Sequence, residues 1–157
     1  MPSSNKAFKA MLKLVNETGT GPIIDLGSGW GNFVIPMARC QPQRQIIGYE
    51  LSLLPWLTSV LIKKAFAIDN LTLYRKDFYR AELPNKSVLI CYLYPQAMQK
   101  IEQLLAKKAN VSFVISNNFA LPSWQADKMI TLNDFYKSPI YLYQIIDKNQ
   151  INATTIK

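Results

Sequence analysis

The stretch Ile23-Ile-Asp-Leu-Gly-Ser-Gly-Trp-Gly31 decides the fold of this chain. A short β-type run leads into glycines at alternate positions, and helix-type sequence continues from about residue 32 to residue 39. Glycines let a chain turn sharply and let its backbone approach a ligand without a Cβ in the way. The helix that follows would direct free N–H groups at an anionic part of that ligand. The stretch therefore predicts a strand, a ligand-binding turn and a helix.

Outward from this turn, β-rich runs alternate with helix-period segments, which indicates a parallel α/β sheet. The strands are expected at residues 23–26, 46–49, 71–74, 88–93, 111–115, 129–132 and 140–146. The helices are expected at residues 8–15, 32–39 and 55–67 and from residue 95 onward. No helix is expected between residues 117 and 128. The chain is instead expected to end in two consecutive strands, which implies an antiparallel hairpin. We predict one α/β domain over residues 1–157, with a mostly parallel seven-stranded sheet.

An acidic residue completes the predicted binding turn. Glu50 follows the second strand, where a carboxylate can accept hydrogen bonds from both ribose hydroxyls. The glycine spacing is GxGxG, whereas a dinucleotide site has GxGxxG. This spacing, with Asp25 before the first glycine, resembles motif I of class I methyltransferases, whose loop wraps the methionine end of S-adenosylmethionine. The alternative is a glycine turn that only packs the strand against the helix.

Two further sites follow the third and fourth strands. Asp77 and Phe78 stand where class I methyltransferases bind the adenine amino group and cover the ring; a capping aspartate with a core phenylalanine is the alternative. The fourth strand runs into Tyr92, Tyr94 and Pro95, where the methyl acceptor should meet the sulfonium. The Asn/Asp-Pro-Pro-Tyr motif of amide and base-nitrogen methylation is absent from this position. A tyrosine-flanked apolar slot suits a lysine amine, because desolvation favours its neutral form. The alternative is that the two tyrosines stand here only because aromatic residues favour strands.

Longer segments make the resemblance narrower. Gly48-Tyr-Glu-Leu51, Pro55-Trp-Leu57, Tyr94-Pro-Gln-Ala-Met98 and Ser116-Asn-Asn-Phe-Ala-Leu-Pro-Ser-Trp-Gln125 are similar to segments of the ATP-synthase c-subunit and adenine-nucleotide-translocase lysine methyltransferases and their prokaryotic relatives. The resemblance covers nearly the whole chain. It implies a Rossmann-like class I methyltransferase fold with helices on both faces of the sheet. It also implies S-adenosyl-L-methionine as the cofactor and a protein lysine as the acceptor.

The resemblance places the site residues as follows. The expected catalytic residues are Tyr94 and Pro95, and no metal site is expected. The expected cofactor-binding residues are Asp25, Gly27, Ser28, Gly29, Gly31, Glu50, Leu51, Asp77, Phe78 and Tyr92. Pro2-Ser-Ser4 resembles a segment that precedes the first helix in this family and lies near the cofactor. Trp30 departs from the family, in which many members have a small acidic residue at this position.

Composition bounds the partners and the location. Lys and Arg number 18 against 10 Asp and Glu, a net charge of +8, which favours RNA or an anionic membrane face unless the charge is simply solvated. The chain has no histidine, which argues against a zinc hydrolase or a Ser-His-Asp hydrolase. Two distant cysteines without a signal peptide predict a reducing, cytoplasmic setting. Family members commonly carry an apolar membrane anchor ahead of this region, so a location peripheral to a membrane, or anchored there through a segment absent from this chain, is the alternative that the resemblance implies. RNA methylation and a cofactor-binding module without turnover remain as alternative functions.

Overall fold

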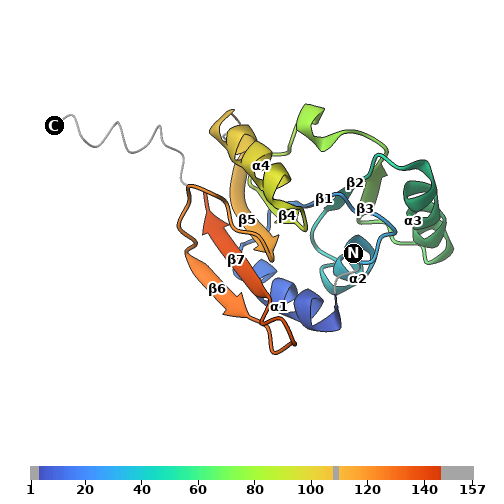
Figure 1. Ribbon diagram of the computed structural model, residues 1–157. Helices are drawn as coiled ribbons and strands as arrows, with labels where there is room; N and C mark the ends of the chain where they lie inside the picture. The colour runs from blue at the N-terminus through green and yellow to red at the C-terminus, as the bar shows by residue number, and fades with distance from the viewer. Residues whose placement is uncertain (1–3, 108–109, 146–157) are drawn as a thin grey trace.

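A seven-stranded sheet forms the centre of the computed structural model, which describes residues 4–107 and 110–145 (Figure 1). The strands are β1 (Ile23–Leu26), β2 (Ile46–Tyr49), β3 (Leu71–Tyr74), β4 (Ser87–Cys91), β5 (Val111–Asn117), β6 (Lys128–Thr131) and β7 (Pro139–Gln144). Their order in the sheet is β3-β2-β1-β4-β5-β7-β6. The first five strands are parallel, and β7 is antiparallel to both of its neighbours. This confirms the predicted sheet and its antiparallel hairpin.

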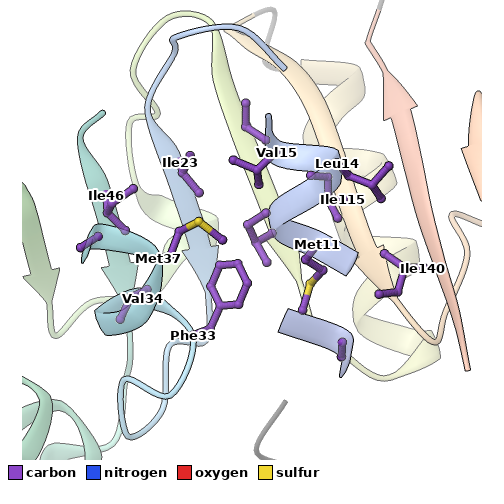
Figure 2. Packing of buried hydrophobic residues seen from close by; sticks show 14 of the residues in the cluster. Met11, Leu14, Val15, Ile23, Phe33, Val34, Met37, Ile46, Ile115 and Ile140 are labelled. Atoms are coloured by element: carbon purple, nitrogen blue, oxygen red, sulfur yellow. The ribbon is translucent and has the colours of Figure 1, made fainter. Parts of the chain in front are cut away.

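Helices cover both faces of the sheet. They are α1 (Asn5–Val15), α2 (Val34–Cys40), α3 (Leu53–Ala65) and α4 (Pro95–Lys107), with a short 3-10 turn, η1 (Phe78–Arg80). The side chains of α1 and α2 pack over one face, and those of α4 pack over the other. Figure 2 shows Phe33 and Met37 near Ile23 of β1, and Met11 of α1 between Phe33 and Ile140 of β7. Alternate strand residues point to opposite faces, so Ile24 packs on the α4 side instead.

The helix α3 differs from the others because it lies at the β3 end of the sheet and buries little of its surface (Figure 1). Ser59 is its one buried residue, and its hydroxyl donates to the carbonyl oxygen of Gly29 at 3.2 Å. Trp56 Nε1 donates to the carbonyl oxygen of Leu73 at 3.3 Å. The helix is thereby fixed against the glycine turn and β3. Among the described residues no helix is both long enough and apolar enough to cross a membrane.

Three predicted helix starts differ from the structure. The first helix begins at Asn5, not residue 8, because Ser4 caps it by accepting a hydrogen bond from the Ala7 N–H at 3.2 Å. The other two starts differ by two residues. The helix after the glycine turn begins at Val34, not residue 32, because Gly31 still has a positive φ of 80° and the turn continues past it. It has only seven residues. The helix expected to start near Pro55 begins at Leu53. Residues in the first helical turn need no intrahelical partner for their N–H groups, so proline is tolerated at this position.

Strand ends were also misplaced. The fourth strand ends at Cys91, not Leu93, because the chain turns here into α4. The fifth strand continues to Asn117, not Ile115, because Asn117 pairs with Ile140 of β7. The predicted last strand extends to residue 146, which lies outside the described residues. The same holds for residues 2 and 3 of the expected cofactor segment.

Candidate functional site

The glycine turn after β1 combines two kinds of glycine. Gly27 and Gly29 have φ angles of 104° and 51°, a region that L side chains rarely adopt. A Cβ at Gly29 would meet no atom within 4 Å, and one at Gly27 would meet only Leu93 Cδ2, at 3.8 Å. A Cβ at Gly31 would lie 2.5 Å from Ile35 Cδ1 and 2.9 Å from Ser59 Oγ. Gly31 is therefore needed for packing, while Gly27 and Gly29 leave space for a ligand.

Glu50 connects the end of β2 to this turn. Its Oε2 accepts a hydrogen bond from the Gly29 N–H at 2.9 Å, and its Oε1 accepts one from the Ser52 N–H at 2.8 Å. The N–H groups of Gly27 and Ser28 both donate to the Tyr49 carbonyl oxygen, at 3.0 and 2.8 Å. Each carboxylate oxygen can accept a second hydrogen bond. Glu50 therefore holds the turn and still has acceptor capacity for hydroxyl groups.

A second carboxyl group is buried directly before the turn. Asp25 is only 4% exposed. Burial, and secondly the negative charge of Glu50, raise its pKa to about 7. A protein interior disfavours a lone carboxylate, and a positively charged ligand nearby would favour its ionisation. The pair of Asp25 and Glu50 therefore makes this end of β1 favourable for a cation.

Apolar side chains flank the carboxylates at the surface. Leu51 is 63% exposed, and Trp30 of the glycine turn is 53% exposed. Phe78 is partly buried and contacts Tyr79, with the ring centroids 4.2 Å apart. Asp77 Oδ1 accepts a hydrogen bond from the Tyr79 N–H at 3.0 Å and so caps η1. The capping alternative is thus present in the structure, and contacts of Asp77 and Phe78 with adenine stay a prediction.

The predicted acceptor corner contains two tyrosines with different surroundings. Tyr94 is 61% exposed, and its carbonyl oxygen accepts from the Ala97 and Met98 N–H groups at the start of α4, where Pro95 is the first residue. Tyr92 is half-buried and lines a cavity of about 330 Å³. The catalytic roles predicted for Tyr94 and Pro95, and the cofactor contact of Tyr92, stay predictions.

This cavity opens where α1, the carboxyl ends of β4 and β5 and the β6–β7 connection meet. Its lining consists of Ser4, Ala7, Tyr92, Asn117, Asn118, Phe119, Leu132, Asp134, Tyr136 and Ser138. The sequence pattern suggested no site role for Asn117 or Asp134. The sequence does indicate that Asn117 ends an apolar strand. The carboxyl ends of the strands are where α/β folds bind ligands, so this position could have been proposed as part of a site.

Residues 25–128 match the family described as the ANTKMT methyltransferase domain. The chain belongs to this family. The matched region contains the glycine turn, Glu50, Asp77, the Tyr94 corner and Asn117. The predicted family and the class I methyltransferase fold are thereby confirmed.

Relatives and solved structures agree with this membership. The chain is 32% identical over 109 residues to the adenine nucleotide translocase lysine N-methyltransferase of Mus musculus, which covers 67% of this chain and 46% of that protein. It is 21% identical to a protein-lysine N-methyltransferase of Saccharolobus islandicus, over 92% of both chains. The chain spans about half the length of the animal relatives that it matches.

A crystal structure of an RNA methyltransferase from Salinibacter ruber, in complex with S-adenosyl-L-homocysteine, has a similar fold. Its TM-score is 0.81 and its identity is 25%, and the match covers 94% of this chain and 95% of that chain. An ANTKMT-family domain therefore shares its fold with methyltransferases of different named substrates.

Proposed function

We propose that this ANTKMT-family chain is an S-adenosyl-L-methionine-dependent methyltransferase that modifies a lysine side chain of a protein. The observation that carries the proposal is the glycine turn fixed by Glu50, directly after the buried Asp25. Two relatives named as lysine N-methyltransferases support the acceptor, and the Saccharolobus islandicus protein aligns over nearly its whole length.

The residues at the turn fit this cofactor. The open backbone at Gly27 and Gly29 allows close approach, and the free lone pairs of Glu50 can accept ribose hydroxyl hydrogens. Asp25 would favour the positive charges of the amino acid and sulfonium groups. The exposed Leu51 offers apolar area to a base. When bound, the cofactor supplies a methyl group that bonds to the acceptor nitrogen while the electron pair of the broken bond stays on sulfur.

The remaining requirement is a neutral, positioned lysine amine. Methyl transfer needs the nitrogen lone pair in line with the methyl group, so positioning supplies much of the rate enhancement. The chain has no histidine to serve as a base. Removal of water on entry into a partly apolar cavity favours the neutral amine, and the proton is released to water.

Labelled cofactor tests the acceptor class. The purified chain is incubated with methyl-labelled S-adenosylmethionine and a cell extract, and the products are treated with protease or with nuclease. We expect protease to release the label and nuclease to leave it in place. Label that survives protease but is lost to nuclease would overturn the lysine assignment.

RNA methylation is the second candidate. The Salinibacter ruber structure, which matches over almost the full length of both chains, carries the name of an RNA methyltransferase. The net charge of +8 also favours a polyanion. The nuclease arm of the labelling experiment identifies this outcome.

We also propose that the protein acts in the cytoplasm, peripheral to an anionic membrane surface. Cys40 and Cys91 are both free thiols, which supports a reducing compartment. On α3, Leu54 and Leu61 are 68% and 58% exposed, and Lys63 and Lys64 follow in the last turn. Exposed leucines beside lysines suit the boundary between lipid headgroups and acyl chains.

A further inference from the structure

Asn117 carries a feature that the proposed cofactor site does not use. It is the last residue of β5 and only 3% exposed, and its Oδ1 is buried without a hydrogen-bond partner within the described part of the chain. A buried polar atom without a partner costs about 1–3 kcal/mol. Such atoms are therefore rare in folded proteins, and each of them calls for an explanation. Asn117 lines the cavity at the sheet edge, so a ligand there could supply the missing donor.

The sheet register places Asn117 at the same end of the sheet as the glycine turn. Asp25 pairs with Ile90 of β4, and Ile90 pairs with Ile115 of β5. Gly27, Tyr92 and Asn117 each follow two residues later. Gly27 and Tyr92 lie just beyond the ends of β1 and β4, and Asn117 is the last residue of β5, so all three lie at the carboxyl ends of adjacent strands. Adjacent strands lie about 4.8 Å apart, so Asn117 is roughly 10 Å from the glycine turn.

The rest of the cavity wall suits an alkylammonium group. Tyr92, Phe119 and Tyr136 contribute aromatic rings, and such rings attract cations through their faces. A hydrogen bond fixes the backbone of Phe119: Ser116 Oγ donates to the Phe119 carbonyl oxygen at 2.5 Å. The carboxylate of Asp134 also belongs to the cavity lining.

The charges around Asp134 set how strongly it attracts a cation. Its pKa is lowered, first by the hydrogen bond from the Ser138 N–H at 2.9 Å and also by the charge of Lys6. Asp134 is therefore ionised at neutral pH. Lys6 Nζ donates to the Asn133 carbonyl oxygen, so one cation already lies near the cavity. The ionised Asp134 can attract a lysine nitrogen into the cavity, where Asn117 Oδ1 is a hydrogen-bond acceptor without a partner among the described residues.

We propose that this cavity binds the acceptor lysine side chain, with Asn117 Oδ1 accepting a hydrogen bond from the lysine Nζ and the aromatic rings of Tyr92 and Phe119 flanking its alkyl chain. This inference rests on the proposed lysine methylation and moves the acceptor site to the α1 side of the β4 end. Asn117 is a positioning residue: it fixes the nitrogen while the lone pair stays free for the methyl group.

Direct binding tests the inference independently of turnover. The probe is Nα-acetyl-lysine methylamide, titrated into the ¹⁵N-labelled full chain with S-adenosylhomocysteine present and followed by NMR. We expect saturable shifts at the amides of Tyr92, Asn117 and Phe119. Asn117→Leu should weaken probe binding at least tenfold, while Asn117→Asp retains it, because the carboxylate keeps an acceptor at the same place.

The controls separate this inference from the cofactor site. Asn133→Leu is the matched substitution at an exposed asparagine beside the cavity, and it should leave probe affinity unchanged. S-adenosylhomocysteine affinity, measured by calorimetry, should change less than threefold in Asn117→Leu. If Asn117→Leu does not fold, Phe119→Ala, at a side chain that is 40% exposed, should weaken probe binding instead.

Three results would overturn the inference. They are the absence of saturable shifts at the three amides, equal probe affinity in wild type and Asn117→Leu, and a loss of S-adenosylhomocysteine affinity that matches the loss of probe affinity. A probe that binds at these amides supports the site even if the labelling experiment finds methylated RNA, an outcome that overturns only the proposed protein substrate. Lysine methylation with an unchanged KM in Asn117→Leu would sink the inference and leave the proposed function intact.

Discussion

Glu50 holds the glycine turn and is also expected to bind the cofactor, so its removal should affect both. Glu50→Ala removes the acceptors of the Gly29 and Ser52 N–H groups together with those offered to the cofactor. We expect S-adenosylhomocysteine binding to weaken by about 1–3 kcal/mol, the cost of leaving hydrogen-bonding groups without their partner. Calorimetry measures this change. Glu17→Ala is the control, since Glu17 only forms an exposed ion pair with Lys128. An unchanged dissociation constant would show that Glu50 does not bind the cofactor.

Asp25 predicts a pH dependence of stability. Its pKa is 3.8 as an isolated group and about 7 in the folded chain, so between these values the folded state holds a proton that the unfolded state has released. Stability from this group therefore falls as pH rises from about 4 to 7, and the full loss, on the order of a few kcal/mol, persists above 7. Urea unfolding at pH 5 and pH 8 should show that the unfolding free energy falls less between these pH values in Asp25→Asn than in the wild type. An equal change of unfolding free energy with pH in both proteins would show that the pKa of Asp25 is not raised in the folded chain.

The two kinds of glycine predict different defects. Gly31→Ala places a Cβ against Ile35 and Ser59 at a positive φ, and we expect a loss of about 1–3 kcal/mol in unfolding free energy. Gly29→Ala meets no neighbour, so it should cost only about 1 kcal/mol of backbone strain and mainly weaken S-adenosylhomocysteine binding. Urea unfolding and calorimetry on both variants check the division. Equal effects on stability would refute it.

At the scale of elements, α1 and α3 differ in what their apolar residues do. Met11 of α1 is fully buried, so Met11→Ala should lower the unfolding free energy by about 2–5 kcal/mol. Leu54→Gln and Leu61→Gln on α3 should each change it by less than about 0.5 kcal/mol, because both side chains are mostly exposed. Thermal unfolding of the three variants tests the contrast.

The same α3 variants test the proposed membrane contact. The double variant Leu54→Gln/Leu61→Gln should lose flotation with vesicles that contain phosphatidylserine, since it removes apolar area that would enter the lipid. Wild-type chain should float with these vesicles and less with neutral ones, because Lys63 and Lys64 favour an anionic surface. Flotation that the double variant retains would argue against α3 as the contact.

In the whole molecule, the apolar clusters on the two faces pack against the same sheet, which favours cooperative unfolding of the chain as one unit. The chain has three tryptophans, in the glycine turn, in α3 and after β5. We expect their fluorescence and the far-ultraviolet circular dichroism to report the same urea midpoint, as two-state unfolding of one domain requires. Midpoints that differ would show that the predicted single domain unfolds in parts.

Local sequence was sufficient for much of the fold and for the conformation of the glycine turn. The strands β1, β2 and β3 lie at the predicted residues, since apolar runs and turn residues act over a few neighbours. The conformation of Gly27 and Gly29 likewise depends on the missing Cβ alone. The place of Glu50 beside them follows from a parallel sheet, whose carboxyl ends meet at one edge.

The side chains that line the cavity at the end of β5 are brought together by tertiary contacts. Tyr92 and Tyr94 are two residues apart and chemically alike, yet Tyr92 lines the cavity with Asn117 while Tyr94 is exposed at the start of α4. Asn117 is buried because β7, far along the chain, pairs with the end of β5. The strand and the glycine turn follow from local backbone preferences, and the place of Glu50 follows from the parallel order of β1 and β2. Long-range strand pairing and helix packing decided the cavity, because no local pattern specifies which distant segments meet.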